Sequence, residues 1–299
     1  MAKQPAAHLA AAPSVGGDDS CGVRSCPAEG TRRSAHAELY DRTRPGYPAQ
    51  LFKDLAVLGG LTRQSRVLEI GCGIGQATAP LAQLGCTIVA VELSPEMAAV
   101  ARRNLQTFPN VTVEVSPFED WIPPATPFDL ILSATAFHWI DPDIRVGKSA
   151  DVLRPGGTLA VVSTEHVAGG TESFFADVQE CYERFDPKTP PGLRQTPAAD
   201  IPDDPTEFER SQRFGSAQFR RYEWEQTYTT KQYLDLLMTY SGHRALAEPA
   251  REGLLACIAN LINRDHGGQI SKRYLTQLTL AHTATQCRPC SGSRTEVSG

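Results

Sequence analysis

Three glycines and two acids at short intervals are the residues of this 299-residue chain whose types and spacing could do chemistry. Gly71, Gly73 and Gly75 alternate directly after an apolar run that contains Glu69, and a helical pattern follows from Gln76. Glycine adopts positive φ and has no Cβ, so a ligand can approach its backbone closely. Open α/β sheets bind nucleotides at a glycine turn between a strand and a helix. The segment therefore predicts a nucleotide-like ligand at the end of a buried strand.

The second acid follows the next apolar run. Residues 87–91 predict a strand, and Glu92 ends it about twenty residues beyond the turn. A carboxylate at this distance accepts hydrogen bonds from two adjacent ribose hydroxyls, because it offers two oxygens. The alternative is that Glu92 caps the helix that follows, a role that Ser94 could fill instead.

The glycine spacing separates two kinds of nucleotide site. A dinucleotide-binding turn, G-x-G-x-x-G, would have its third glycine at position 76, where this chain has Gln76. The observed E-x-G-x-G-x-G resembles the first motif of class I S-adenosylmethionine-dependent methyltransferases. The segments FDLILSATAFHW (128–139) and LRPGG (153–157) resemble later motifs of that family. The segment AELYDRTRPGYP (37–48) resembles its small-molecule branch, which includes trans-aconitate methyltransferase-like proteins.

This resemblance implies an α/β fold, namely a Rossmann-like seven-stranded sheet with helices on both faces and a helical cap. The implied strand order is 3-2-1-4-5-7-6, with the last strand antiparallel. Continuous apolar runs support five buried parallel strands, with LRPGG as the turn before the fifth. Further along, the patterns predict strands over 218–229 and 274–282, and helices over 95–105, 173–184, 234–240 and 248–263.

Composition along the chain predicts four segments. Residues 1–35 and 283–299 are rich in small polar residues without periodicity, so we expect a disordered leader and a disordered tail. The resemblance places the cofactor-binding core over residues 36–165. Residues 166–282 are then expected to hold the cap or lid and the final strands of the sheet.

The same resemblance implies S-adenosylmethionine as cofactor and S-adenosylhomocysteine as product. The loop after the third predicted strand, residues 111–115, lies beside the adenine in this family, so Phe118 could pack on the ring and Glu119 or Asp120 could meet its amine. An ordinary surface loop with a buried Phe is the alternative. The predicted cofactor-binding residues are Tyr40, Arg44, Glu69, Gly71, Cys72, Gly73, Gln76, Glu92, Leu93, Met97, Phe118, Glu119, Ser133 and Ala134.

Two further positions could act on the acceptor. His138 follows the fourth strand, and an imidazole titrates near neutrality, so His138 is the candidate catalytic base. The alternative is that it shapes the pocket wall, because a carboxylate acceptor needs no base. Arg42 and Arg44 could clamp a carboxylate of the cofactor or of an acidic substrate, or form a solvated turn. His166 is a weaker pocket candidate.

These features predict methyl transfer to a small-molecule acceptor, at an oxygen of a carboxylate or hydroxyl. A nicotinamide-dependent oxidoreductase is the first alternative, and Gln76 argues against it. A methyltransferase acting on protein or nucleic acid is the second. The (D/N/S)-P-P-(Y/F/W) motif of amino-methylating nucleic-acid enzymes is replaced here by the sequence SATA at 133–136. A cofactor-binding protein without catalysis also fits the sequence.

Composition limits the partners. The formal net charge is −5, which argues against a nucleic-acid partner. No run approaches the roughly eighteen apolar residues of a membrane helix, and the first residues lack the apolar core of a secretory signal. We therefore expect a cytoplasmic monomer or homodimer without a membrane partner, and the possible clamp at Arg42 and Arg44 favours a small acidic substrate.

Eight cysteines are present. Cys86, Cys181 and Cys257 lie in apolar surroundings and are interpreted as small core residues. Cys72 lies in the glycine turn, and two pairs lie near the ends of the chain, Cys21 with Cys26 and Cys287 with Cys290. A zinc site formed by these pairs is possible in principle. Free thiols in disordered tails are the preferred interpretation, so no metal is predicted.

Overall fold

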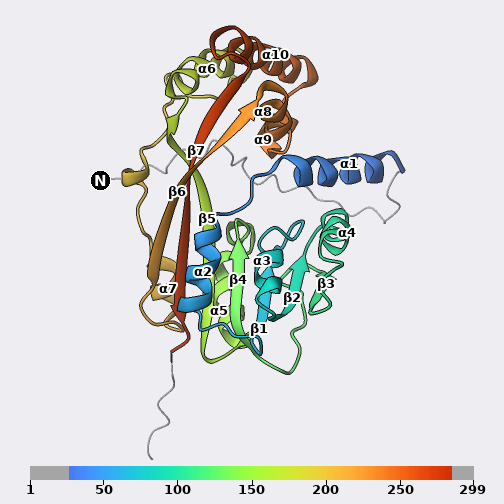
Figure 1. Cartoon of the computed structure of the whole chain (residues 1–299), viewed down its shortest axis with the longest axis vertical. Helices are drawn as coiled ribbons and strands as arrows, with labels where there is room; N and C mark the ends of the chain where they lie inside the picture. The colour runs from blue at the N-terminus through green and yellow to red at the C-terminus, as the bar shows by residue number, and fades with distance from the viewer. Residues whose placement is uncertain (1–26, 285–299) are drawn as a thin grey trace, which may run out of the picture.

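The computed structural model describes residues 27–284, with side chains described from Arg33 onward. A seven-stranded sheet runs through the chain in the order β3-β2-β1-β4-β5-β7-β6, as predicted (Figure 1). Strands β1 to β5 pair in parallel, and β7 pairs antiparallel with both β5 and β6. The strands are β1 (Arg66–Ile70), β2 (Thr87–Glu92), β3 (Val111–Val115), β4 (Phe128–Ala134), β5 (Leu153–Gly170), β6 (Gln218–Thr229) and β7 (Gln269–His282).

Helices cover both faces of the core part of the sheet. Successive residues of a strand point to opposite faces, so Val67 packs with Leu51 and Leu81 on one side while Leu68 packs with Phe137 on the other. The helices are α1 (Pro27–Thr43), α2 (Ala49–Leu58), α3 (Thr78–Gln83), α4 (Pro95–Asn104), α5 (Pro142–Val152), α6 (Glu172–Phe185), α7 (Thr206–Ser211), α8 (Thr230–Leu237), α9 (Ser241–Ala245) and α10 (Glu248–Asp265), with short 3-10 turns at Phe137–Trp139 and Ala198–Asp200.

The last three strands are much longer than the first. Strand β1 has 5 residues, whereas β5 has 18 and β7 has 14. Figure 1 shows that β5, β6 and β7 extend beyond the core and carry α6, α8, α9 and α10 at their far end. The LRPGG segment, predicted as a turn before the fifth strand, lies inside β5, although Gly156 keeps a turn-like φ of +72°.

The cap has a hydrophobic core of its own. Phe174, Leu236, Leu254 and Ile258 are fully buried in it, together with aromatic residues from β6 and β7. Helix α8 begins at Thr230 rather than near Leu234, because Thr229 and Gln232 form a capping box.

The cysteine prediction was wrong for one pair. Cys181 of α6 and Cys257 of α10 form a disulfide with their Cα atoms 5.8 Å apart. Their 76-residue separation gave no sign of this, because only the packing of α6 against α10 brings them together. Cys72 and Cys86 are free and buried, as expected of core thiols. The four terminal cysteines lie outside the described residues.

Part of the predicted leader is helical. Helix α1 starts at Pro27, inside the segment 1–35 that was expected to be disordered, and its later part packs against α4 and α8. Arg103 of α4 donates to Glu38 and Asp41 of α1, which ties the two helices together. The rest of the predicted leader, and all but the start of the predicted tail, lie outside the described residues.

Candidate active site

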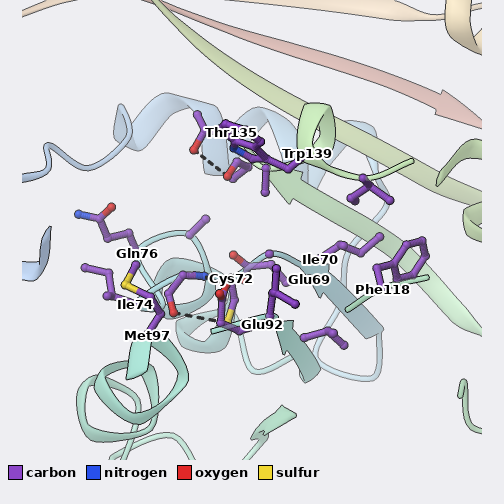
Figure 2. A pocket seen from close by; sticks show the side chains of 18 of the residues that line it. Glu69, Ile70, Cys72, Ile74, Gln76, Glu92, Met97, Phe118, Thr135 and Trp139 are labelled. Carbon is purple, nitrogen blue, oxygen red and sulfur yellow. Dashed lines mark hydrogen bonds between the residues drawn. The ribbon is translucent and has the colours of Figure 1, made fainter. Parts of the chain in front are cut away.

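A cavity of about 310 Å³ lies at the carboxyl ends of β1, β2 and β4. In Figure 2, Gln76 and Ile74 lie at one end and Phe118 at the other, with Glu69 and Glu92 between them. Thr135 and Trp139 form the opposite wall. The lining residues are Tyr40, Tyr47, Glu69, Ile70, Gly71, Cys72, Gly73, Ile74, Gln76, Ala77, Val91, Glu92, Leu93, Met97, Ser116, Pro117, Phe118, Glu119, Ala134, Thr135, Ala136, Trp139 and Ile140.

The floor of the cavity is the glycine turn, and its backbone requires glycine. Gly71 has a φ of +70°, and a Cβ there would lie 2.4 Å from the Cβ of Ala136. Gly73 has a φ of +58°, and a Cβ there would meet only the Cε of Met97 at 3.8 Å. The backbone at Gly73 therefore faces open space, where a ligand could approach it without a side chain in between.

Two acids line the middle of the cavity. Glu92 accepts hydrogen bonds from the backbone N–H of Gly73 at 2.8 Å and of Ser94 at 2.9 Å, one on each carboxylate oxygen. Each oxygen has a second lone pair, so the carboxylate can still accept two donors from a ligand.

Glu69 is in a different state. It is 1% exposed, and its Oε2 has no hydrogen-bond partner among the described residues. Burial raises the pKa of its carboxyl to about 8, the nearby Thr78 hydroxyl opposes that rise, and the neighbouring charge of Glu92 adds to it. A buried carboxyl oxygen without a partner is unfavourable, so this position favours a ligand that brings a donor or a positive charge.

Lys148 fixes the end of the cavity that is formed by Phe118. Lys148 donates to the backbone oxygens of Glu119 at 2.8 Å and Trp121 at 2.7 Å, and its ammonium lies 5.2 Å from the ring centre of Phe118. The carboxylate of Glu119 accepts from the N–H of Asp141 at 3.0 Å. These contacts hold the loop after β3 in place, so the Phe118 ring is preorganised at the cavity end.

The wall opposite the acids carries backbone strain. Thr135 follows β4 with a φ of +55°, a conformation that β-branched residues rarely adopt. Its hydroxyl lies 2.9 Å from that of Tyr47, whose pKa is raised by burial, so Tyr47 stays protonated. Strain of this kind concentrates at functional sites, and here it turns the end of β4 into the cavity.

Comparison with known sequences agrees with this geometry. Residues 67–157, which span β1 to the beginning of β5, match the family described as a methyltransferase domain. The match includes the glycine turn, both acids, the Phe118 loop and the strained end of β4.

Relatives of known name match the same part of the chain. An uncharacterised methyltransferase of Mycobacterium bovis is 40% identical over 125 residues, which is 41% of this chain and 48% of the relative. Trans-aconitate 2-methyltransferase of Mycobacterium tuberculosis is 35% identical over 121 residues, 39% of this chain and 43% of the relative. The chain therefore spans about half the length of the curated relatives that it matches.

Solved structures extend the likeness of fold beyond the methyltransferase domain. A proposed type II methyltransferase from Anaeromyxobacter dehalogenans superposes with a TM-score of 0.52 at 26% identity, covering 81% of this chain and 98% of that one. The superposition therefore includes most of the region after residue 157, which the family match leaves out.

The structure brings most of the predicted cofactor residues together. All of them except Arg44 and Ser133 line the cavity of the methyltransferase domain. Ser133 is fully buried and donates to the backbone oxygen of Ile70 at 3.1 Å, so it supports the cavity floor. Arg44 points toward the cap, where its Nε donates to Thr239 at 2.8 Å.

The predicted base lies apart from this group. His138 is exposed and does not line the cavity, and its ring packs beside Trp139 with the centroids 4.9 Å apart. Arg42 is exposed on α1, so it does not form a clamp with Arg44. His166 lies in contact with the cap residues Tyr240 and Tyr274.

Sequence reasoning missed Tyr47 and Thr135 as lining residues, whereas Trp139 lines the cavity as the pocket-wall alternative for the segment around His138 predicted. Tyr47 belongs to the AELYDRTRPGYP segment and Thr135 to FDLILSATAFHW, so a signal was present in motifs already recognised. Among the residues whose side chains are described, no cluster of His, Cys, Asp or Glu could hold a metal ion. Within the same part of the chain, no helix is long and apolar enough to cross a membrane.

Proposed function

We propose that this chain binds S-adenosylmethionine in the cavity of its methyltransferase domain and transfers the methyl group to a small molecule. The observation that carries the proposal is Glu69. Its buried Oε2 lacks a partner at the end of a turn where the backbone of Gly73 faces open space. The cationic ammonium of the cofactor would supply the missing donor and lower the pKa that burial has raised.

The other cavity residues suit the remaining parts of that molecule. The free lone pairs of Glu92 could accept the two ribose hydroxyls, and the ring of Phe118 could cover the adenine. Gln76 donates to the backbone oxygen of Arg44 at 2.9 Å, which holds the segment after α1 beside the opposite end of the cavity. Tyr40 of α1 lines the cavity at that segment.

When bound, the cofactor supplies an electrophilic methyl group on its sulfonium. This chain's residues then have to exclude water and hold an acceptor atom in line with that group. The strained Thr135 follows β4 and Tyr47 precedes α2, and the contact between their hydroxyls fixes the wall against which an acceptor would rest. Since His138 lies outside the cavity lining, we propose an oxygen acceptor, a carboxylate or an acidic hydroxyl, that needs no general base.

Titration calorimetry with S-adenosylmethionine and with NAD tests the cofactor. We expect binding of S-adenosylmethionine alone, because the turn has Gln76 where a dinucleotide site would have its third glycine. Binding of NAD alone would support the oxidoreductase alternative instead. Turnover is then tested with methyl-labelled cofactor against phenols and against carboxylates, the class that the name of the trans-aconitate relative indicates.

We further propose that the chain acts in the cytoplasm as a monomer or homodimer. The support is limited to the described residues, where no membrane-spanning helix occurs. Disulfides are unusual in the cytosol, so the oxidation state of Cys181 and Cys257 in freshly prepared extract tests the location. Sedimentation of the purified chain tests its oligomeric state.

A further inference from the structure

A group of basic and aromatic side chains lies where the segment after α1 meets the cap, outside the cofactor cavity. Figure 1 shows α1 between the core and the cap, and α1 packs against α8. The group is built from four distant segments of the chain. It consists of Arg44 after α1, His166 on β5, Tyr240 between α8 and α9, and Lys272 and Tyr274 on β7.

Lys272 is the unusual member. It is 3% exposed, and no hydrogen bond joins its ammonium to any residue that the structure describes. Its Nζ lies 5.5 to 5.8 Å from the ring centres of Tyr233, Tyr240 and Tyr274. Burial lowers its pKa well below the usual value, and the charge of Arg44 lowers it further. The charged neighbour that acts on this lysine is thus another cation, whereas a buried lysine is normally paired with an acid.

Arg44 is held in a fixed orientation with part of its donor set unused. Its Nε donates to Thr239 at 2.8 Å, and its guanidinium lies 4.9 Å from the ring centre of Tyr40 and 4.2 Å from that of Tyr240. Within the described chain, its two terminal nitrogens make no hydrogen bond. A guanidinium fixed between two rings with two parallel N–H groups free matches the geometry of a carboxylate.

The neighbouring groups leave the positive charge uncompensated. His166 bonds to the hydroxyl of Tyr240 at 3.2 Å, and burial, Lys272 and Arg44 together lower its pKa, so it stays neutral near pH 7. The nearby acid Asp186 raises the pKa of His243, and it is not among the groups that shift the pKa of Lys272. The two cations therefore face neutral hydroxyls, rings and an imidazole.

We propose that Arg44 and Lys272 bind a carboxylate of the methyl acceptor, an inference that rests on the proposed methyl transfer. The position is suitable because Tyr40, whose ring contacts Arg44, also lines the cofactor cavity. A carboxylate neutralised by two cations is a weak nucleophile. The bound carboxylate therefore anchors the acceptor, and a second oxygen of the same molecule receives the methyl group. The acceptor class is a small acid with a second acidic group or a hydroxyl.

The test uses the full chain saturated with S-adenosylhomocysteine, so that no turnover occurs. Binding of succinate, malate and phthalate is measured by calorimetry and compared with binding of their uncharged amides. We expect the acids to bind and the amides to bind at least about tenfold more weakly, since hydrogen bonds between two charged groups are stronger than those to a neutral acceptor. Equal affinity for acids and amides, or no binding of any acid, would overturn the proposal.

Lys272→Met removes the charge at similar volume, and Arg273→Met is its matched control. Arg273 is the next residue on β7 and pairs with Glu225 on the exposed side. We expect Lys272→Met to weaken acid binding about tenfold or more, Lys272→Arg to restore most of it, and Arg273→Met to leave it unchanged. Unaltered acid binding by Lys272→Met would refute the role of this lysine.

Two readouts separate this proposal from a structural role and from the cofactor proposal. Lys272→Met should unfold at the same or a higher temperature, because an apolar side chain replaces a buried unpaired cation. A lower unfolding temperature together with weaker cofactor binding would indicate a structural lysine and overturn the proposal. If wild type binds acids but not S-adenosylmethionine, the methyl-transfer proposal fails while the anion site stands.

Discussion

The cofactor cavity and the Arg44–Lys272 group beneath the cap each bury an ionisable side chain, an acid in the first and an amine in the second, and neither region supplies a counter-charge for it. The cavity holds Glu69 with an unpaired oxygen, and the basic group holds Lys272 without an acid. Burying a charge is unfavourable unless it is paired. Each region therefore lacks a counter-charge that a ligand would supply. In the cavity the ligand would bring a cationic group, and on the cap side it would be an anion.

The largest effect that would test this contrast is expected at the glycine turn. Gly73→Asp places a third carboxylate beside Glu92 and into the space left for the ligand, and it forces a φ of +58° on a residue with a Cβ. We expect calorimetry to show a loss of S-adenosylmethionine affinity of about 1,000-fold or more, corresponding to about 4 kcal/mol.

Gly60→Asp is the matched control for that change. Gly60 has a similar φ of +62°, and a Cβ there meets nothing within 4 Å. The control therefore carries the backbone strain without reaching the cavity. Unchanged cofactor affinity in Gly73→Asp would show that the ligand does not lie over this turn.

Glu69 and Lys272 should give the free energy of unfolding opposite dependences on pH. Burial raises the pKa of Glu69 to about 8 from its ordinary 4.5. Its contribution is thus fully present below pH 4.5 and is lost as pH rises through about 8, by roughly 4–5 kcal/mol. Burial lowers the pKa of Lys272 below its ordinary 10.5. Its contribution is present above pH 10.5 and is lost as pH falls through the folded-state value.

Urea unfolding of the cofactor-free chain at several pH values measures these two pH dependences. Relative to wild type, Glu69→Gln should gain stability as pH rises from about 4.5 to about 8, and Lys272→Met should gain stability as pH falls. Glu69→Gln should also bind S-adenosylmethionine more weakly, whereas Lys272→Met should not. Parallel pH profiles for the two variants and wild type would contradict the assigned charge states.

The disulfide tests whether the two regions are stabilised separately. It closes a 76-residue separation within the region that carries the cap helices, and such a link contributes about 2–4 kcal/mol. We expect the double variant Cys181→Ser, Cys257→Ser to lose about that much stability while its cofactor affinity stays within about twofold. Cys86→Ala, which removes a free buried thiol of the core, is the control. Loss of cofactor binding on removing the disulfide would show that the cavity depends on the cap.

The smallest effect is expected at His138. Its exposed ring lies outside the cavity lining, so His138→Ala should change kcat by less than about threefold and leave its pH profile unaltered. A general base would instead contribute about 100-fold or more. A loss of that size would place His138 in contact with the acceptor and remove the case for an acceptor that needs no base.

Much of the core could be predicted because its signals are local. Each parallel strand is a short apolar run covered on both faces, and the glycine turn joins one strand to the next helix without a break. The family resemblance implied the strand order, and the structure confirmed it. The 218–229 strand was also predicted with its observed bounds, because its residues alternate along one edge of the sheet.

The errors lie where contacts join distant segments. LRPGG carries the residue types of a turn, yet β5 begins at its first residue, because Leu153 pairs with Phe128 of β4 ahead of an irregularity in the register. Cys181 and Cys257 lie in apolar sequence surroundings on two separate helices, and only the packing of α6 against α10 brings them close enough to form a disulfide. Arg44 was grouped with the cofactor residues by its motif, but its side chain turns toward Thr239 and Tyr240.

The sequence by itself determined the single strands of the core, because each follows from local periodicity. It also determined the glycine turn with Glu69 and Glu92, because these residues lie within about thirty positions of one another. Only the tertiary structure decided the basic group, since Arg44, His166, Tyr240 and Lys272 are up to 228 positions apart in the printed sequence. Their meeting depends on the length of β5 and β7, which carry the cap back over the segment after α1. Burial then makes their charges matter, and burial is a property of packing that no single segment contains.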